Sequence, residues 1–290
     1  MRSETLDWIR KHPFFVVITL LMLFNLLLLS IYIRHQHRDL RVSFLDIGQG
    51  DAVFIQAPNG TQMLYDAGPP TGAVLRALSS EMPFFDRTID VAIFSHPDMD
   101  HIGGFKDVFD HYKVDVLMEP GASSTNGVYD DIKSTIAAHG IKSIVARRGM
   151  SIDMGDGVVA DILYPDRDEN WPDTNSASIV MRIHYGDTAF LLSGDLPERQ
   201  EEYVTSLDGG NLHSQVLKIG HHGSRTSSSE IWLRAIHPDI AVISAGLSNR
   251  YGHPHKEVLN LLEKLGIGYL ITFKEGTIDF ESDGKTISRK

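Results

Sequence analysis

The sequence has 290 residues, of which 27 are basic and 38 acidic, and a formal net charge of −11. This length accommodates one large domain plus an appendage, and the acidic balance disfavours tight, unspecific binding to nucleic acid. The absence of cysteine excludes disulfides and thiolate metal sites, so metal ligands must be His, Asp or Glu.

Residues 14–33 form an apolar run without a charged residue. As a helix this run would be roughly 30 Å long, about the thickness of a bilayer core. A cleavable signal peptide would have a shorter apolar region and a small-residue cleavage site, and the residues from Arg34 onward offer none. The run therefore predicts a single-pass membrane anchor within a tail at 1–40, with a buried core helix as the alternative.

The orientation of this predicted anchor rests on its flanks. Basic residues lie both before and after the run, so the charge bias is weak. The short N-terminal tail favours a cytoplasmic N-terminus. We therefore expect the domain at 41–290 on the extracytoplasmic side of the membrane.

From position 41 the pattern changes to short strands and helices. Strands are predicted at 42–46, 52–56, 62–66, 89–94, 114–118, 158–163, 179–184, 188–192, 215–219, 240–244, 269–273 and 277–280. Helices are predicted at 72–80, 105–109, 128–139, 196–206, 229–236 and 255–265. No repeat or linker divides this part of the chain, so we expect two sheets with outer helices in one domain.

The most informative polar residues follow the apolar strand at 89–94. They are His96, Asp98, Asp100 and His101, in a loop that ends with Gly103-Gly104. Carboxylates and imidazoles are costly to bury without a partner, and a metal ion supplies one. One short loop can serve two adjacent metals, with the first two side chains facing one ion and the last two facing the other.

Four later stretches also place polar residues beside an apolar strand or a helix. They are Asp195, the pair His221-His222, the segment 173–178 and the segment 251–255. Each has an ordinary alternative, because an Asp at this position can cap the following helix and paired histidines can be surface residues. Since these loops would converge at one edge of the sheets, their combination favours a site.

As a set, these motifs resemble the metallo-β-lactamase superfamily. The loop at 96–104 resembles the first metal motif of that superfamily. The rest is similar to the hydrolase domain of ComEC-type DNA-uptake proteins, through FLDIGQGDA (44–52), YDAG (65–68), LSGD (192–195), KIGHHGS (218–224) and YGHPH (251–255). The resemblance covers about residues 41–282, and it implies an α/β fold, an αββα sandwich with metals at one sheet edge.

The resemblance also implies two divalent metal ions, Zn²⁺ or Mn²⁺. By position, the ligands would be His96 and Asp98 for the first ion, Asp100, His101 and His221 for the second, and Asp195 as the bridge. Asp98 stands where many members have His, and the usual mid-chain His is missing from the region of Asn175. Oxygen ligands make the first site harder, which makes Mn²⁺ plausible beside Zn²⁺.

The implied chemistry is hydrolysis. Two adjacent metals would share a hydroxide of near-neutral pKa, and Asp100 would bind metal and orient that nucleophile. His253 is the expected proton donor to the leaving group, with His222 behind it. The alternative for His253 is simple packing beside Pro254.

Three residues around the histidine loop are expected to bind substrate: Lys218, Ser224 and Arg225. A lysine or arginine here could hold a phosphate, although Lys218 could also be a solvated strand end.

The leading hypothesis is a membrane-anchored phosphodiesterase or nuclease that acts on single-stranded or double-stranded DNA outside the cell membrane. A DNA-uptake channel protein is a further expected partner. One alternative is hydrolysis of a small molecule such as a lactam, thioester or nucleotide, which the acidic body keeps open. Another is a non-catalytic DNA-holding module, against which the intact Asp100, His101, Asp195 and His221 argue.

Overall fold

The computed structural model describes residues 10–36, 39–168 and 171–290, apart from the side chains of 30–36. The chain divides into two compact units, Met1–Arg38 and Asp39–Lys290. Residues 1–9 and 37–38 of the predicted tail lie outside the described residues.

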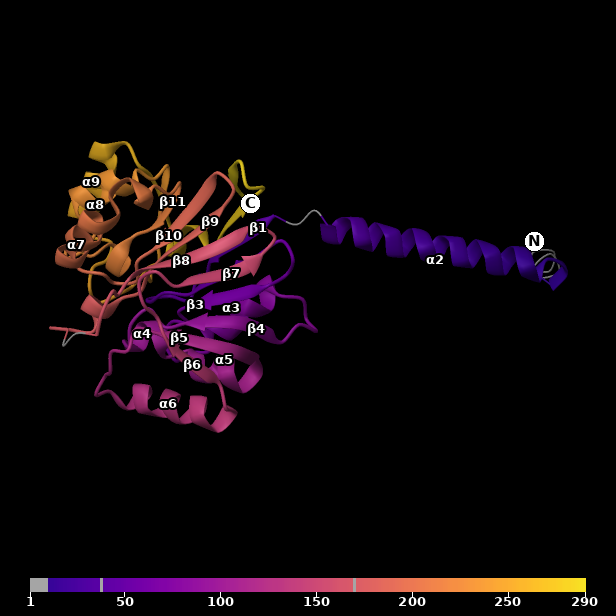
Figure 1. The fold of residues 1–290 in the computed structure, drawn as a ribbon, viewed down its shortest axis with the longest axis horizontal. Helices are drawn as coiled ribbons and strands as arrows, with labels where there is room; N and C mark the ends of the chain where they lie inside the picture. The colour runs from indigo at the N-terminus through magenta and orange to yellow at the C-terminus, as the bar shows by residue number, and fades with distance from the viewer. Residues whose placement is uncertain (1–9, 37–38, 169–170) are drawn as a thin grey trace. The chain divides into compact units, whose positions relative to one another are not determined.

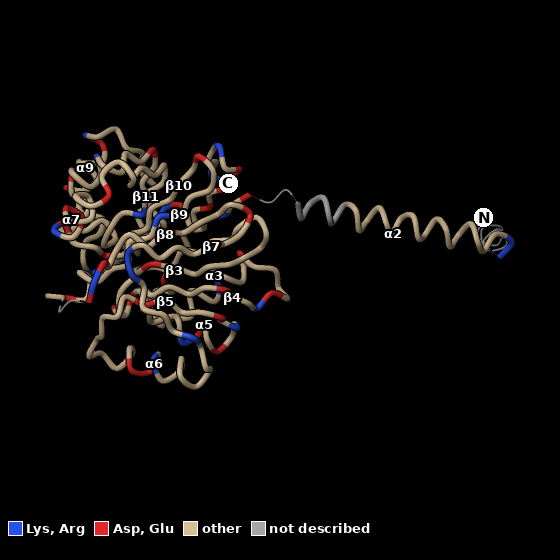
Figure 2. Tube along the Cα trace, in the orientation of Figure 1, with Lys and Arg blue, Asp and Glu red and all other residues tan. Residues whose placement is uncertain are grey.

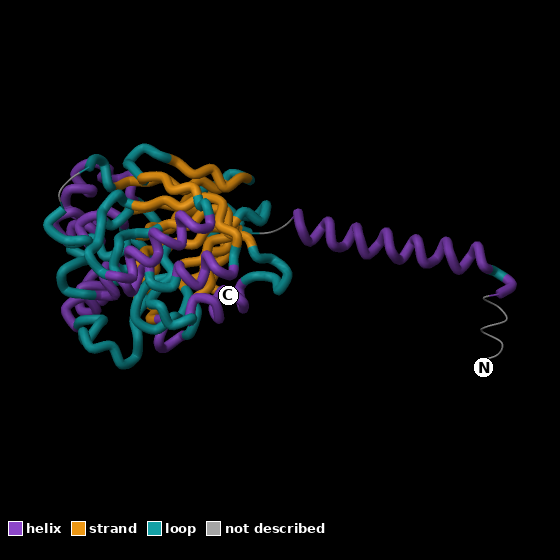
Figure 3. The backbone as a smooth tube through the Cα atoms, turned by 90° about the horizontal axis from the view of Figure 1, so that it is seen from below, coloured by secondary structure: helices purple, strands orange, loops and turns teal. Residues whose placement is uncertain are grey.

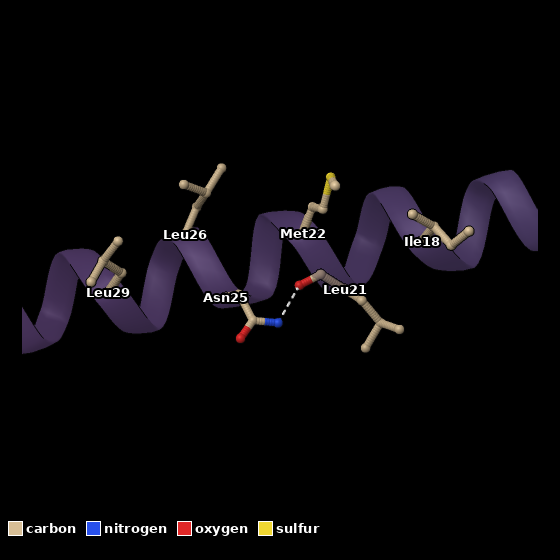
Figure 4. Close-up of a pocket in the computed structure, with 6 residues that line it drawn as sticks. All are labelled: Ile18, Leu21, Met22, Asn25, Leu26 and Leu29. Atoms are coloured by element: carbon tan, nitrogen blue, oxygen red, sulfur yellow. Dashed lines mark hydrogen bonds between the residues drawn. The ribbon is translucent and has the colours of Figure 1, made fainter.

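The first unit contains a long apolar helix, α2, at Pro13–Gln36 (Figure 1). Its polar residue Asn25 donates a hydrogen bond from Nδ2 to the carbonyl oxygen of Leu21 at 2.8 Å. Figure 4 shows this bond and the apolar neighbours Ile18, Leu21, Met22, Leu26 and Leu29. The helix therefore satisfies its polar side chain within its own backbone.

The membrane span predicted at 14–33 is not supported. Within the part of the chain that the structure describes, no helix has both the length and the apolar character needed to cross a membrane. The predicted span extends to residue 33, whereas side chains on α2 are described only as far as Leu29.

The first sheet of the second unit contains eight strands in the order β15-β14-β1-β2-β3-β4-β5-β6. Their bounds are Leu40–Phe44 (β1), Val53–Gln56 (β2), Gln62–Tyr65 (β3), Thr88–Ile93 (β4), Lys113–Glu119 (β5), Lys142–Val145 (β6), Ile278–Ser282 (β14) and Ile287–Arg289 (β15). Strands β3 to β6 are parallel, and β1 pairs antiparallel with both β2 and β14.

The second sheet contains seven strands in the order β13-β12-β11-β10-β9-β8-β7. Their bounds are Ser151–Gly155 (β7), Val158–Tyr164 (β8), Val180–Tyr185 (β9), Thr188–Leu192 (β10), Val216–Lys218 (β11), Ile240–Ile243 (β12) and Gly268–Ile271 (β13). Strands β10 to β13 are parallel, whereas β7, β8 and β9 pair antiparallel.

Helices cover the outer face of each sheet (Figures 1 and 3). The first sheet carries α3 (Ala73–Glu81), α5 (Phe105–His111) and α6 (Gly127–His139), and the second carries α7 (Glu198–Asp208), α8 (Glu230–Ile236) and α9 (Lys256–Leu265). Shorter elements are α4 (Met99–Ile102), α10 (Thr272–Glu275), η1 (Asn175–Ala177), η2 (Gly209–Leu212) and η3 (Gly220–Gly223). The predicted arrangement of two sheets with outer helices is confirmed.

Three apolar clusters fill the spaces between these layers. Met63 and Tyr65 of β3 face the cluster between the sheets, whereas Leu64 faces the cluster under the outer helices. This alternation is the two-residue period of a strand that is buried on both faces. Between the sheets, the ring of Phe280 lies 6.0 Å from that of Phe44 and 6.3 Å from that of Phe190.

Several element predictions were wrong. Strands β6, β7 and β15 were not predicted, because they are short edge strands with largely exposed residues and no apolar run. The strand predicted at 269–273 ends at Ile271, where α10 begins. The helix predicted at 196–206 begins at Glu198, because Pro197 occupies its N-cap in an extended conformation.

Candidate metal centre

The candidate site lies where parallel strands of both sheets end. The segments that follow these strands are Asp66 after β3, 95–104 after β4, Asp195 after β10, 220–224 after β11 and 244–253 after β12. Because the carboxyl ends of parallel strands meet at one edge of a sheet, their polar residues come together there.

The loop after β4 is folded against the end of β3. The carbonyl oxygen of Asp98 accepts the backbone amide of His101 at 3.0 Å, which starts the short helix α4. A Cβ atom at Gly104 would collide with the carbonyl oxygen of Ala67. Glycine is therefore required here for the loop to approach the neighbouring backbone.

His101 has a carboxylate at each ring nitrogen. Its Nδ1 donates to Asp66 at 2.8 Å, and its Nε2 lies 3.3 Å from an oxygen of Asp195. Asp66 also accepts the amide of Ser95 at 2.8 Å and its hydroxyl at 2.6 Å. All four residues are buried. Asp66 thus fixes the imidazole with Nε2 directed into the site, as the partners of metal-binding histidines do.

His96 and Asp98 lie close to each other, and their predicted role as ligands of a first metal ion stays a prediction. Nδ1 of His96 lies 2.9 Å from the hydroxyl of Ser95, which already donates its proton to a carboxylate, so the imidazole is the donor. Its Nε2 is left unprotonated and lies 3.8 Å from Asp98. The other oxygen of Asp98 accepts the hydroxyl of Thr174 at 2.6 Å. Thr174, next to Asn175, thus supplies a polar contact to Asp98 in the region where the usual mid-chain histidine is missing.

The paired histidines lie in η3, and both have left-handed backbone conformations, with φ of 49° at His221 and 55° at His222. Such a conformation costs about 1–2 kcal/mol for a residue with a Cβ atom. Two in succession are a concentration of strain of the kind found at functional sites. Nε2 of His221 lies 3.7 Å from Asp195, and its Nδ1 lies 3.1 Å from the hydroxyl of Thr226.

His222 lies deeper in the site than its neighbour. Its Nδ1 donates to the carbonyl oxygen of Ser244 at 3.0 Å and lies 3.2 Å from Asp51. Its Nε2 lies 3.4 Å from Asp100 and 3.6 Å from Asp195. The geometry therefore places His222, rather than the predicted ligand His221, in the group that could hold a metal ion, while its role as a reserve proton donor stays a prediction.

Asp51 and Lys218 form a buried ion pair in the same cluster. The Lys218 ammonium also lies 3.4 Å from the carbonyl oxygen of Gly194 and 3.9 Å from Asp195. Burial opposes ionisation of Asp51, but the charges of Lys218 and His222 outweigh it and lower the pKa of Asp51. Lys218 is only 1% exposed, so its ammonium faces the buried carboxylates rather than the solvent. Its predicted contact with substrate stays a prediction.

The donor set fits a divalent ion. Side-chain atoms of four residues lie within 4.8 Å of one another: Asp51, His101, Asp195 and His222. Among the described residues, the buried atoms without a hydrogen-bond partner include Nε2 of His96, His101 and His222 and Oδ1 of Asp195. Such atoms are costly to bury unless a cation binds them. A set of nitrogen and oxygen donors suits Zn²⁺ or Mn²⁺.

Burial and neighbouring charges both shift the pKa of these groups. Burial disfavours the charged form of His101, but Asp195 and Asp66 raise its pKa well above the ordinary value. Burial likewise opposes the charge on His222, and Asp195 with Asp51 raises its pKa to about 9. Burial and the charge of His101 lower the pKa of His96 to about 3. The cluster thus holds excess negative charge that a cation would neutralise.

A cavity of about 200 Å³ opens beside the cluster. Its lining residues are Gln49, Asp98, Asp100, Asp195, His221, His222, Tyr251 and His253. Burial and the charges of His222 and His221 lower the pKa of His253 to about 4. His253 is therefore mainly uncharged near neutral pH, and its predicted role as the proton donor stays a prediction.

The two other residues predicted to bind substrate do not line this cavity. Ser224 is buried, and its hydroxyl lies 3.0 Å from that of Thr226. The Arg225 guanidinium lies 3.8 Å from Glu257. The roles of Ser224 and Arg225 in binding substrate stay predictions.

Asp51 and Asp66 were not predicted as site residues, although they lie in the motifs FLDIGQGDA (44–52) and YDAG (65–68). Each follows or precedes an apolar strand, the same pattern that identified Asp195. Thr174 lies in the predicted segment 173–178, but a single hydroxyl in a loop gives no pattern that would mark it as the contact of Asp98.

Comparison with known proteins supports the fold and the motifs. A family model described as the metallo-beta-lactamase superfamily matches residues 45–246. ComE operon protein 3 of Bacillus subtilis (strain 168) is 32% identical over 260 residues, covering 82% of this chain and 32% of the relative. Competence protein ComA of Neisseria gonorrhoeae is 35% identical over 239 residues, again covering 82% and 32%. This chain thus spans about a third of the length of these curated relatives.

Solved structures share the fold at low sequence identity. The metallo hydrolase Igni18 of the archaeon Ignicoccus hospitalis has a TM-score of 0.53 at 13% identity, covering 83% of this chain and 99% of that chain. The diiron β-hydroxylase CmlA of Streptomyces venezuelae has a TM-score of 0.52 at 14% identity, covering 80% and 52%. At this identity the likeness concerns the fold alone.

Proposed function

The chain belongs to the metallo-β-lactamase superfamily, and from that premise we propose that it is a metal-dependent hydrolase of phosphodiester bonds in DNA. The observation that carries the proposal is the set of buried, unpartnered imidazole nitrogens and carboxylate oxygens beside the cavity. The names of the competence relatives support DNA as the substrate. The cavity of about 200 Å³ is small, which favours a single strand that presents one phosphodiester at a time.

Different residues of the chain would bind metal and orient the metal-binding histidines. The residues that would hold metal are Asp195, His101 and His222, joined by His96, Asp98, Asp100 and His221. Bound divalent ions would activate water as a nucleophile at neutral pH and stabilise negative charge on the phosphoryl oxygens. Asp66 and the carbonyl of Ser244 orient their histidines so that Nε2 faces the site.

Two residues at the cavity would position the reacting groups. Asp100 presents a carboxylate that would orient the attacking water and is held 3.4 Å from Nε2 of His222. His253, which its lowered pKa leaves uncharged near neutral pH, would donate a hydrogen bond to the leaving oxygen. Its Nδ1 is buried and has no hydrogen-bond partner among the described residues.

Hydrolysis of a small molecule is the second candidate function. The net charge of −11 favours it, and Figure 2 shows basic residues interspersed with acidic ones over the body. A lactam, thioester or nucleotide would not need an extended basic surface.

Substrate assays separate the two candidates. The purified full chain, loaded with Mn²⁺ or Zn²⁺, is tested on single-stranded DNA, duplex DNA, RNA, bis(p-nitrophenyl) phosphate and a β-lactam. We expect cleavage of single-stranded DNA and of the phosphodiester. Turnover of the β-lactam with intact nucleic acids would overturn the proposal.

The metal assignment is tested separately from turnover. Asp195→Ala should lose bound metal and activity together, because it removes a carboxylate shared by three histidines. Asp110→Ala is the matched control, since that carboxylate is exposed on α5. Metal content is measured by elemental analysis and folding by circular dichroism. Equal metal content in both variants would remove Asp195 from the site.

A further inference from the structure

The loop between β12 and α9 carries an arginine that the proposed hydrolysis does not use. Arg250 is exposed and directly precedes Tyr251, which is 48% exposed and lines the cavity. Of the other cations near the site, Lys218 is buried against Asp51 and Arg225 lies 3.8 Å from Glu257. The surroundings of Arg250 therefore differ from those of Lys218 and Arg225, each of which lies close to a carboxylate.

Arg250 is held by an aromatic residue. Its Nη2 donates to the hydroxyl of Tyr251 at 2.8 Å, and its Cζ lies 4.9 Å from the ring centroid. The tyrosine ring in turn stacks on His253, with centroids 5.5 Å apart and an interplanar angle of 21°. In the described part of the chain, no carboxylate lies within 4.0 Å of this guanidinium. The guanidinium is thus anchored and keeps its charge available.

The loop that carries Arg250 is braced from within. Asn249 donates from Nδ2 to the carbonyl oxygens of Gly246 and His253 at 2.8 and 2.7 Å, and its Oδ1 accepts the amide of His253 at 2.9 Å. The amide of Gly246 donates at 3.2 Å to the side chain of Gln49, another residue of the cavity lining. The loop is therefore fixed to the cavity at both ends, so Arg250 has a preorganised position.

We propose that Arg250 and Tyr251 form a subsite for the phosphate that neighbours the scissile phosphate in a DNA strand. This inference rests on the proposed phosphodiesterase function and specifies its substrate as a strand with consecutive phosphates. A guanidinium offers a planar pair of donors that matches two phosphate oxygens, and here it is bonded to Tyr251, which lines the acidic cavity. The subsite thus accounts for how a chain with a net charge of −11 retains a strand at its cavity.

Binding without turnover is the first test. A short fluorescein-labelled thymidine oligonucleotide is titrated with the metal-free full chain and followed by anisotropy. Arg250→Ala should raise Kd about tenfold, because a charge-assisted pair is lost. Arg250→Lys should give a smaller rise, since it keeps the charge and loses the planar pair of donors. Tyr251→Phe should raise Kd about threefold by releasing the guanidinium. Lys142→Ala, at an exposed cation at the start of β6, should leave Kd unchanged.

Substrate discrimination is the second test. With metal bound, Arg250→Ala should raise KM for the oligonucleotide about tenfold more than KM for bis(p-nitrophenyl) phosphate, which has no neighbouring phosphate. Equal changes for both substrates, or an unchanged Kd in the first test, would overturn the subsite. Absence of oligonucleotide binding by the wild-type chain would do the same. If the wild-type chain binds the oligonucleotide but cleaves neither substrate, the proposed hydrolysis fails while the Kd series still decides on Arg250.

Discussion

Asp66 contacts the candidate metal centre through a histidine. Its carboxylate accepts Nδ1 of His101 at 2.8 Å and is fully buried. Asp66→Asn keeps the shape but removes the charge, so we expect metal affinity to fall about tenfold or more while the chain stays folded. Calorimetric titration of the full chain with Mn²⁺ or Zn²⁺ measures this. Asp110→Asn, at an exposed carboxylate, is the control, and equal affinities for the two variants would contradict the role of Asp66.

Glu201 is a buried carboxyl group that ties α7 to the segment after the histidine loop. Its oxygens accept the backbone amides of Ser228 and Ser229 at 2.6 and 2.8 Å. Burial is the largest influence and raises its pKa from 4.5 to about 7. The folded state therefore binds more protons than the unfolded state between these values. The stability that protonated Glu201 contributes is complete below pH 4.5 and lost as the pH rises through 7.

The linkage predicts a specific difference between variants. Relative to the wild-type chain, Glu201→Gln should become more stable by about 3 kcal/mol as the pH rises from 4.5 to 7, because it does not titrate. Its absolute stability at low pH should be lower, since an amide replaces one acceptor oxygen. Urea unfolding across this pH range measures the difference. Glu202→Gln, at an exposed position on the same helix, should follow the wild-type curve. If the stability of Glu201→Gln and that of the wild-type chain changed with pH in the same way, the raised pKa of Glu201 would be contradicted.

At the scale of elements, the loop after β4 depends on one close backbone approach. Gly104 has a helical φ of −75°, so its requirement is space rather than conformation. A Cβ there would collide with the carbonyl oxygen of Ala67. Gly104→Ala should therefore destabilise the chain by about 2 kcal/mol and weaken metal binding, as the loop carries His101. Gly127→Ala has open space at the start of α6 and should be neutral or stabilising. Urea unfolding distinguishes them, and equal stabilities would show that the loop can shift freely.

The sequence predicts the elements that position the site because those strands are rich in apolar residues. The strands β10 and β11 are buried along their length and β4 is buried in part, and each is followed by polar residues of the types that bind metal ions. The edge strands β6 and β7 escape prediction because solvent on one side removes the apolar run. Loop geometry escapes it as well: no pattern in the residues indicates the positive φ angles of His221 and His222.

At the scale of the whole molecule, the sequence indicates which residue types gather but not every pair that forms. Asp195 and His101 are predicted together because both follow strands whose carboxyl ends meet. The ion pair between Asp51 and Lys218 joins the two sheets and depends on how one sheet faces the other. No periodicity within a single sheet contains that information. The same holds for Arg250, whose importance comes from the cavity beside its loop rather than from a motif.

The distribution of charge over the molecule leads to the last prediction. The chain carries a net charge of −11, and its basic residues are interspersed with acidic ones (Figure 2). Near the cavity, Lys218 forms an ion pair with Asp51, and Arg225 faces Glu257. A bound strand should therefore have only one or two phosphates neutralised by the protein, with Arg250 the main contributor.

Binding of single-stranded DNA should consequently depend only weakly on salt. Each neutralised phosphate contributes a slope of about −0.7 to the logarithm of the binding constant against that of salt concentration. We expect a slope of about −1 for the metal-free full chain, moving toward zero in Arg250→Ala. Anisotropy titrations over a range of potassium chloride concentrations measure it. A slope of about −4 or steeper would mean that several cations contact the strand, and the assignment of strand retention mainly to the loop at 246–253 would then be wrong.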